Sequence, residues 1–324
     1  MLGGLLSLLS ALAFSYANAS VRRGVLTGTV LQAVAISLPV ALPMFVIAML
    51  LTGGFHLLGG FSWRSLGLLS LAGIIHFAWA RHCNYRATKA IGANLVAPVQ
   101  QFSVVITLVL AVLWLGETLT LLRIVGIALV FLGPALTLKP VSSAKPATGR
   151  GTFNPEYAEG YFYALLSSIG FGVSPVMIAM AFDKRTLAAG IAGAFVSYVA
   201  ATVAVALLLL LPGQWRGFKA TDGTSTKWFL LSGFAVGLAQ MLRYMALAVA
   251  PVSVVSPIQR LSLVFRIYFG WIINPQHEVF GGRVVGATVL SLLGVLALSV
   301  STDSVLHSIP LPAIVISALA WHWP

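Results

Sequence analysis

The chain has 324 residues, of which 59% are hydrophobic and only 8% are charged. A soluble globular protein is about 45–50% apolar and about 25% charged, so this composition excludes a soluble fold. The 19 Lys and Arg residues outnumber the 7 Asp and Glu residues, which gives a formal net charge of +12. In so hydrophobic a chain this excess indicates orientation in a membrane and no nucleic-acid partner. Cys83 is the single cysteine, so an internal disulfide framework is excluded.

Ten segments are apolar over about 20 residues, the length that spans the hydrocarbon core of a bilayer. Residues 139–159 form a long polar connection that divides these segments into two groups of five. Residues 303–324 are apolar but short, and Trp321 and Trp323 indicate an interfacial or re-entrant tail. The pattern predicts an all-α, multi-pass integral protein of the cell (inner or plasma) membrane. The predicted spans are 3–20, 27–51, 66–89, 93–115, 119–138, 160–182, 187–211, 228–249, 252–273 and 283–302.

The second half of the chain repeats the first at an offset of 157 to 160 residues. The first span has an apolar core and an Ala17-Asn18-Ala19 pattern like those of a signal peptide. Its Leu8-Leu9-Ser10 returns as Leu165-Leu166-Ser167, however, so we interpret it as the first helix of a repeat. Between 80–105 and 239–264, eight of 26 positions are identical: Ala80/Ala239, Tyr85/Tyr244, Ala87/Ala246, Val96/Val255, Pro98/Pro257, Gln100/Gln259, Ser103/Ser262 and Val105/Val264.

Five spans is an odd number, so the second copy of the repeat enters the membrane in the opposite sense to the first. Inverted repeats are typical of secondary transporters, whose substrate sites lie near the midplane between the copies. The predicted fold is therefore ten transmembrane helices arranged as two inverted five-helix repeats. Its parts are a first repeat at 1–138, a connecting loop at 139–159, a second repeat at 160–302 and a tail at 303–324.

Several short motifs carry a resemblance to a known family. Tyr85-Arg86-Ala87 closes the third span, Pro98 lies in the fourth, and Leu115-Gly116-Glu117 leads into a fifth span that carries Gly126. This order resembles the EamA-type repeat of the drug/metabolite transporter superfamily. The second half keeps the tyrosine, alanine, proline and glycine but has Asn274-Pro275-Gln276-His277-Glu278 in place of the LGE turn. The resemblance extends to about residue 302 and implies a ten-helix carrier of small molecules.

All seven acidic residues fall in predicted connections or at the ends of spans. Many cation-coupled carriers and cation exporters rely on a carboxylate inside the membrane, so those mechanisms are disfavoured. The six histidines and the single cysteine form no HExxH motif and no ligand cluster. We therefore expect no metal site, no cofactor and no enzymatic activity.

Four arginines lie inside predicted spans, where an arginine is costly unless it faces a cavity or a partner. Helical spacing groups them with other polar residues on helices 3, 4, 8 and 9, and these stripes predict a common cavity. Guanidinium groups there would bind a carboxylate or phosphate. The alternatives are that the arginines snorkel to an interface or bond backbone carbonyls at helix breaks. The predicted substrate-binding residues are Arg81, Asn84, Tyr85, Gln101, Gln240, Arg243, Tyr244, Gln259, Arg260 and Arg266.

His76 lies in the middle of the third span. It is the interior group whose side chain ordinarily titrates near neutral pH, which makes it the candidate for proton coupling. The alternative is that it is a hydrogen-bonded packing residue.

The remaining basic residues predict the orientation of the chain. Arg64, Arg123, Lys184 and Arg185 lie on one side of the ten-span arrangement, and the positive-inside rule makes the richer, opposite side cytoplasmic. Both termini would then lie outside, whereas the family resemblance implies that both lie inside. The residues on the richer side are Arg22, Arg23, Arg86, Lys89, Lys139, Lys145, Arg150, Arg216, Lys219, Lys227 and Arg283.

Together these patterns predict a secondary transporter, or permease, that moves a small polar metabolite across the lipid bilayer by alternating access. An amino acid or an organic anion fits the interior arginines best. The alternatives are a flippase for a lipid-linked anionic group, a multidrug or cationic metabolite exporter, and a membrane-embedded enzyme. The substrate, the coupling ion and the transport direction stay open, as does a homodimer.

Overall fold

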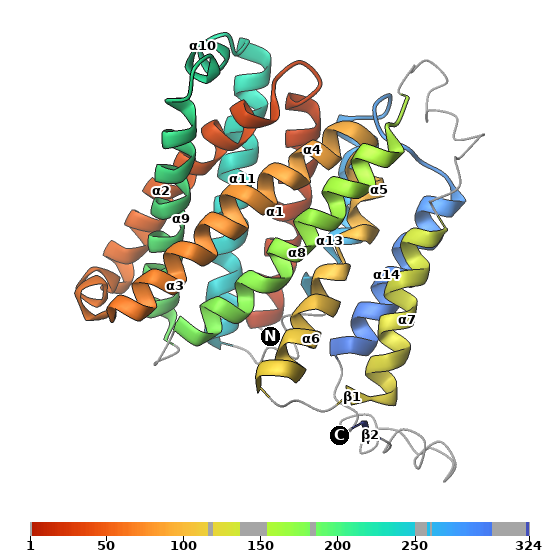
Figure 1. Cartoon of the computed structure of the whole chain (residues 1–324), viewed down its shortest axis with the longest axis horizontal. Coiled ribbons are helices and arrows are strands. Elements are labelled where there is room, and N and C mark those ends of the chain that lie inside the picture. The colour runs from red at the N-terminus through yellow and green to blue at the C-terminus, as the bar shows by residue number, and fades with distance from the viewer. Residues whose placement is uncertain are drawn as a thin grey trace.

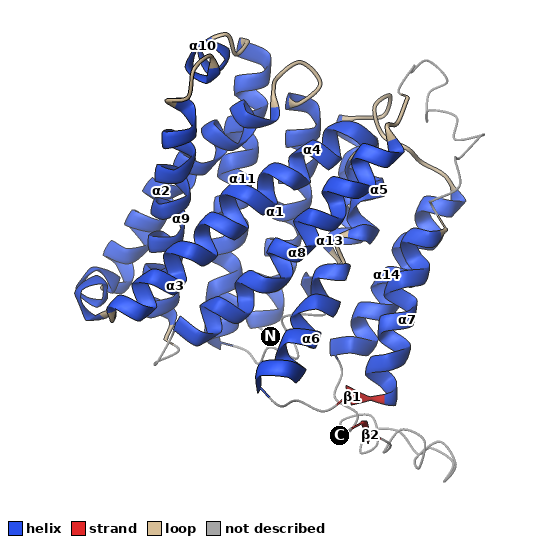
Figure 2. Ribbon diagram, in the orientation of Figure 1, coloured by secondary structure: helices blue, strands red, loops and turns tan. Residues whose placement is uncertain are grey.

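A computed structural model describes residues 2–115, 119–136, 154–181, 186–249, 258–259, 261–299 and 322–323. Most of these residues form helices that stand together in one bundle (Figures 1 and 2). The elements of the first half are α1 (Leu2–Gly24), α2 (Val30–Thr52), η1 (Gly54–Gly60), α3 (Trp63–Gly73), η2 (Ile74–Ala80), α4 (Arg81–Ile91), α5 (Ala93–Val99), α6 (Phe102–Leu115), β1 (Leu119–Thr120) and α7 (Leu121–Ala135).

The second half is also mainly helical. Its elements are α8 (Tyr157–Ala181), α9 (Leu187–Leu209), α10 (Gln214–Lys219), α11 (Gly223–Val249), α13 (Ser262–Ile273), α14 (Gly282–Ser299) and β2 (His322–Trp323). All ten predicted spans contain described helix. Of the tail predicted at 303–324, only β2 is described, and it pairs antiparallel with β1. Of the long connection predicted at 139–159, residues 139–153 lie outside the described residues, and the described chain resumes at residue 154.

Four of the described helices are long and apolar enough to cross a membrane: Leu2–Gly24, Val30–Thr52, Tyr157–Ile178 and Ala188–Leu209. A fifth crossing is reached if η1 and the helical run 63–91, which bend by 112° at their junction, count as one span. Three further apolar helices, Ile124–Gly133, Ser262–Ile273 and Gly282–Ala297, are shorter. The chain is thus a multi-pass integral membrane protein, and ten crossings remain a prediction.

Two helical runs of the first half are irregular where polar side chains gather. Residues 74–80, which include His76, form a π-helical segment between α3 and α4. The run predicted at 93–115 is broken after Pro98, whose ring cannot donate to the preceding turn. Backbone bonds from Gln101 to Pro98 and from Ser103 to Gln100 close tight turns at this break. Such irregular segments often mark functional sites in helices.

Helices from the two halves pack against each other throughout the bundle. The pairs in close contact include α1 with α11 and α13, α8 with α3, α4 and α6, α9 with α2 and α3, α2 with α11, and α7 with α14. Small residues permit these approaches. A Cβ on Gly73 would lie 2.2 Å from the Ser197 carbonyl oxygen, and one on Gly294 would lie 2.8 Å from the Gly126 carbonyl oxygen.

Candidate functional site

Arg81 is buried in the middle of the bundle, where its side chain is 5% exposed. Its Nη2 donates to the Tyr198 hydroxyl of α9 over 3.1 Å, and its guanidinium carbon lies 5.1 Å from the ring centre of Phe77. Its Nη1 has no hydrogen-bond partner among the described residues. These contacts hold the guanidinium of Arg81 inside the protein.

A second polar contact set joins three helical segments. The Nε2 of Gln100, at the break between α5 and α6, donates to the Asn84 Oδ1 of α4 over 2.7 Å. Its Oε1 accepts from the Arg266 Nη1 of α13 over 2.7 Å. Asn84 and Arg266 were both predicted as site residues, and the break in the helix gives Gln100 access to both. Helix breaks at the contact between repeats are where transporters bind substrates and ions.

His76 lies near Arg81 and Arg243. Its Nδ1 is 2.6 Å from the Ser174 Oγ of α8, and its ring contacts Phe77 and Phe171. Arg243 of α11 and Arg81 are both within electrostatic range of it. We call the contacts of Arg81 with Tyr198, of Gln100 with Asn84 and Arg266, and of His76 with Ser174 the central polar network.

The other predicted site residues are placed less closely together. Tyr85 and Gln240 are buried, and Gln101 is buried with its amide donating to the Ala97 carbonyl of its own helix. Gln259 donates to the Ser10 hydroxyl over a long 3.5 Å. Tyr244 lies within α11, but its side chain lies outside the described residues, as does the whole of Arg260.

A cavity of about 600 Å³ lies at one end of the bundle, where α1 ends and α2 and α8 begin. We call this end the connection face; in Figure 1 it is the upper edge. The predicted stripes were expected to line a common cavity, but none of the predicted site residues borders this one. Its lining is mixed in charge and comprises Arg22, Val25, Leu26, Val30, Leu31, His82, Arg86, Lys89, Ala90, Asn154, Glu156 and Glu159.

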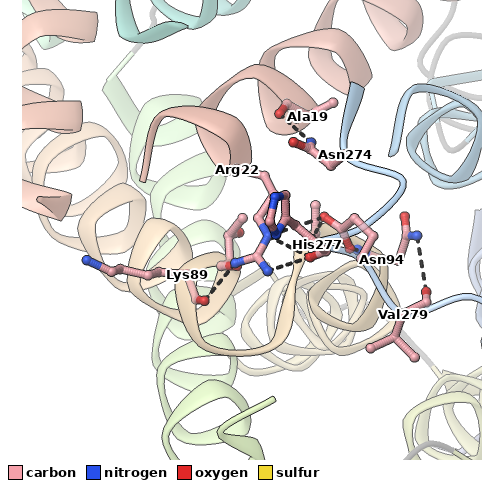
Figure 3. Close-up of polar contacts among 10 residues, drawn as sticks. Ala19, Arg22, Lys89, Asn94, Asn274, His277 and Val279 are labelled. Atoms are coloured by element: carbon pink, nitrogen blue, oxygen red, sulfur yellow. Dashed lines mark hydrogen bonds and ion pairs between the residues drawn. The ribbon is translucent and has the colours of Figure 1, made fainter. Parts of the chain in front are cut away.

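Arg22 closes the inner side of this cavity. Its side chain is fully buried, and its Nη1 donates to the carbonyl oxygens of Thr88 and Lys89 over 2.8 and 2.7 Å. Its Nε and Nη2 donate to the carbonyl oxygen of His277 (Figure 3). Thr88 and Lys89 lie in the last turn of α4, and a cation is stabilised by the carbonyls at a helix C-terminus.

Glu278 is the negative partner of Arg22. It is 3% exposed, and its Oε1 lies 3.8 Å from the Arg22 Nε. Its two carboxylate oxygens accept from the backbone N–H groups of Ala93 and Asn94, the first residues of α5, over 2.7 and 3.0 Å. Gly92 forms the corner between α4 and α5 with φ of +82°, and a Cβ there would lie 2.5 Å from Glu278 Oε2.

We call Arg22, Glu278 and the backbone groups they bond the Arg22–Glu278 clasp. Burial raises the pKa of Glu278, while Arg22, the two N–H groups and Arg266 oppose that shift. Burial and the positive charges of Arg23 and Arg22 lower the pKa of the neighbouring His277. Two further bonds hold this connection in place: Asn274 donates to the Ala19 carbonyl and Asn94 to the Val279 carbonyl (Figure 3).

The clasp corrects two expectations from the sequence. Arg22 was expected among the charges that mark a membrane face, but α1 continues past it and buries it. Glu278 does lie in a connection, as expected, yet it is buried and within electrostatic range of Arg266, so the interior arginines are not remote from every carboxylate. The sequence offered one signal for Glu278, its position in the segment that replaces the LGE turn.

The described residues contain no group of three or more His, Cys, Asp or Glu side chains that could hold a metal ion. No curated protein matches the chain. Twenty-two chains of solved structures match it. One of them, titled only "Crystal structure of protein", aligns with a TM-score of 0.58 at 17% identity, over 95% of this chain and 99% of that one. At that identity the match shows the fold alone.

The model of the EamA-like transporter family matches residues 1–139, which are the first predicted repeat. This match confirms the resemblance carried by Tyr85, Pro98 and the Leu115-Gly116-Glu117 turn. Over these residues, which are less than half of the chain, the protein is similar to the EamA-like transporter family.

Proposed function

We propose that the chain is a secondary transporter of ten crossings that moves a small polar metabolite with a carboxylate or phosphate group, such as an amino acid or organic anion, by alternating access. The proposal that the substrate is anionic rests on a single observation, the surroundings of the Arg81 side chain. Its buried guanidinium has a neutral hydroxyl and aromatic faces around it and an Nη1 without a partner among the described residues.

The charge of Arg81 has no compensating carboxylate among the described residues. Two ion pairs occur in that part of the chain, Arg22 with Glu278 and Arg86 with Glu159, and neither includes Arg81. Removing a charge from water without pairing it costs several kcal/mol. An anionic group on a substrate would supply the missing partner through charge-assisted hydrogen bonds, which are the strong ones.

The contacts between helices support the proposal that the chain consists of two related halves. If α1 corresponds to α8, α2 to α9, α3 and α4 to α11, α5 and α6 to α13, and α7 to α14, the main contacts named above have counterparts. The α1–α11 contact corresponds to α8 with α3 and α4, α2–α11 to α9–α3, and α1–α13 to α8–α6. The pairs α2–α9 and α7–α14 correspond to themselves. In Figure 1, α1 starts at the lower edge and α8 at the upper edge, as an inverted repeat requires.

A ligand screen on the purified full-length protein tests the anionic substrate. Thermal unfolding is measured with anionic, zwitterionic, cationic and lipid-linked anionic compounds. A ligand present at 100 times its Kd stabilises the folded state by about 2.7 kcal/mol, which raises Tm measurably. We expect anion-bearing compounds to raise Tm and cations to have no effect.

Two arginine variants test whether the ligand-induced rise in Tm depends on Arg81. Arg81→Gln keeps most of the side chain's volume and removes the charge, so it should abolish the shift. Arg86→Gln is the matched control, because Arg86 lies five residues along the same helix but its side chain is 45% exposed and paired with Glu159. If Arg81→Gln keeps the shift for every anionic ligand, the proposed role of Arg81 is wrong. If only cations raise Tm, the anionic substrate class is wrong.

A further inference from the structure

We propose that the Arg22–Glu278 clasp is the gate that closes the transport pathway on the connection face, between the cavity there and the central polar network. This inference rests on the proposed function, because a gate requires a pathway. It assigns a role in transport to two residues that lie outside the central polar network.

The geometry of the clasp is that of a barrier assembled from separate segments. Arg22 comes from the end of α1, the carbonyls of Thr88 and Lys89 from the end of α4, and His277 and Glu278 from the connection between α13 and α14. The N–H groups that hold Glu278 belong to α5. The clasp therefore joins elements of both halves at a single point, and moving the halves apart at this face would require it to open.

The clasp lies between two polar regions. On the outer side Arg22 borders the cavity of about 600 Å³. On the inner side Glu278 is within electrostatic range of Arg266, which bonds Gln100 in the central polar network. The fully buried ion pair thus borders the cavity through Arg22 and is within electrostatic range of the central polar network through Glu278.

The chemistry of the clasp also fits the expected substrate. Arg22 is the positive half of the pair and borders the cavity, so an anionic group that enters there competes with Glu278 for the guanidinium. Loss of the carboxylate also frees the N–H groups of Ala93 and Asn94. An arriving anion could therefore loosen the contact between α5 and the connection at 274–281.

Reporter cysteines test this gate without knowledge of the substrate. The full-length protein carries Cys83→Ala and one new cysteine, and the rate of reaction with a charged thiol reagent is measured in lipid nanodiscs. Leu26→Cys borders the cavity and should react readily in every background. Thr88→Cys lies at the clasp itself, at a position that is fully buried, and should react slowly while the clasp is closed. Ser291→Cys, also fully buried but in α14, reports any general loosening of the fold.

Glu278→Gln removes the negative charge of the clasp. It should raise the rate of the thiol reaction at position 88 about tenfold, which corresponds to a loss of about 1.4 kcal/mol in the free energy that favours the closed state. The control is Asp222→Asn, which removes the charge of an exposed carboxylate outside the cavity lining and should leave the rate unchanged. Arg22→Lys keeps the charge but lacks the planar fork with which the guanidinium reaches carbonyls of separate segments, so it should raise the rate less; it replaces Glu278→Gln if that variant fails to fold.

An unchanged rate at position 88 in a folded Glu278→Gln or Arg22→Lys variant would overturn the gate. An equal rise at position 291 would also overturn it, because the clasp would then be a general structural contact. Neither result bears on the ligand screen with Arg81→Gln, so failure of the gate and failure of the anionic substrate can be told apart.

Discussion

Gly73 of α3 offers a sharp test of helix packing, because a methyl group there has no room. Its Cβ would lie 2.2 Å from the Ser197 carbonyl oxygen of α9, against 3.4 Å for ordinary contact, so α3 and α9 must separate by about 1.2 Å. That movement also strains the 2.8 Å bond from the Ser197 hydroxyl to the Leu69 carbonyl. Overpacking costs about 1–3 kcal/mol and a lost hydrogen bond about 1 kcal/mol. We expect Gly73→Ala to destabilise the protein by about 2–4 kcal/mol.

Gly67 provides the matched control in the same helix. A Cβ there meets nothing within 4 Å, and alanine is a better helix former than glycine by up to about 1 kcal/mol. Thermal unfolding of both variants in the same detergent should give a clearly lower Tm for Gly73→Ala and an unchanged or slightly higher Tm for Gly67→Ala. Equal Tm values for the two variants would refute the close approach of α3 and α9.

Two further predictions concern the network and the orientation. Gln100→Leu removes the amide that joins Asn84 Oδ1 to Arg266 Nη1, at about 1 kcal/mol for each lost hydrogen bond, so thermal unfolding should show a clearly lower Tm than for the unchanged protein. An unchanged Tm would contradict the network. A reporter fused after Pro324 should lie outside the cytoplasm, because the basic ends of α1, α4 and α10 gather at the opposite face. A cytoplasmic reporter would reverse the orientation.

The sequence was sufficient to locate the helices and one interior stripe. Apolar runs of spanning length show where helices form, because a chain in lipid must satisfy its backbone groups within each segment. The spacing of Arg81, Asn84 and Tyr85 placed them on one face of a helix, and the structure confirms that all three are buried. A polar stripe in an apolar helix can hardly face lipid, so its burial follows from composition alone.

The breaks and the clasp could not be predicted in the same way. Pro98 marks a weak point in its helix, but the exact break at Gln100 and Gln101 depends on partners supplied by α4 and α13. Arg22 lies near the end of an apolar run, where an arginine ordinarily reaches water. Its burial depends on three carbonyls that come from residues 66, 67 and 255 positions away along the chain. Contacts of that range leave no local pattern.

The Arg22–Glu278 clasp also breaks the symmetry between the halves. Under the repeat offset, Arg22 corresponds to positions 179 to 182, which are Ala179, Met180, Ala181 and Phe182, and none of these residues is basic. Two identical inverted copies would present equal barriers to the two compartments. If the clasp is the proposed gate and the opposite face has no equal barrier, the carrier would rest with its connection face closed, and the energy required would differ between the inward and outward steps.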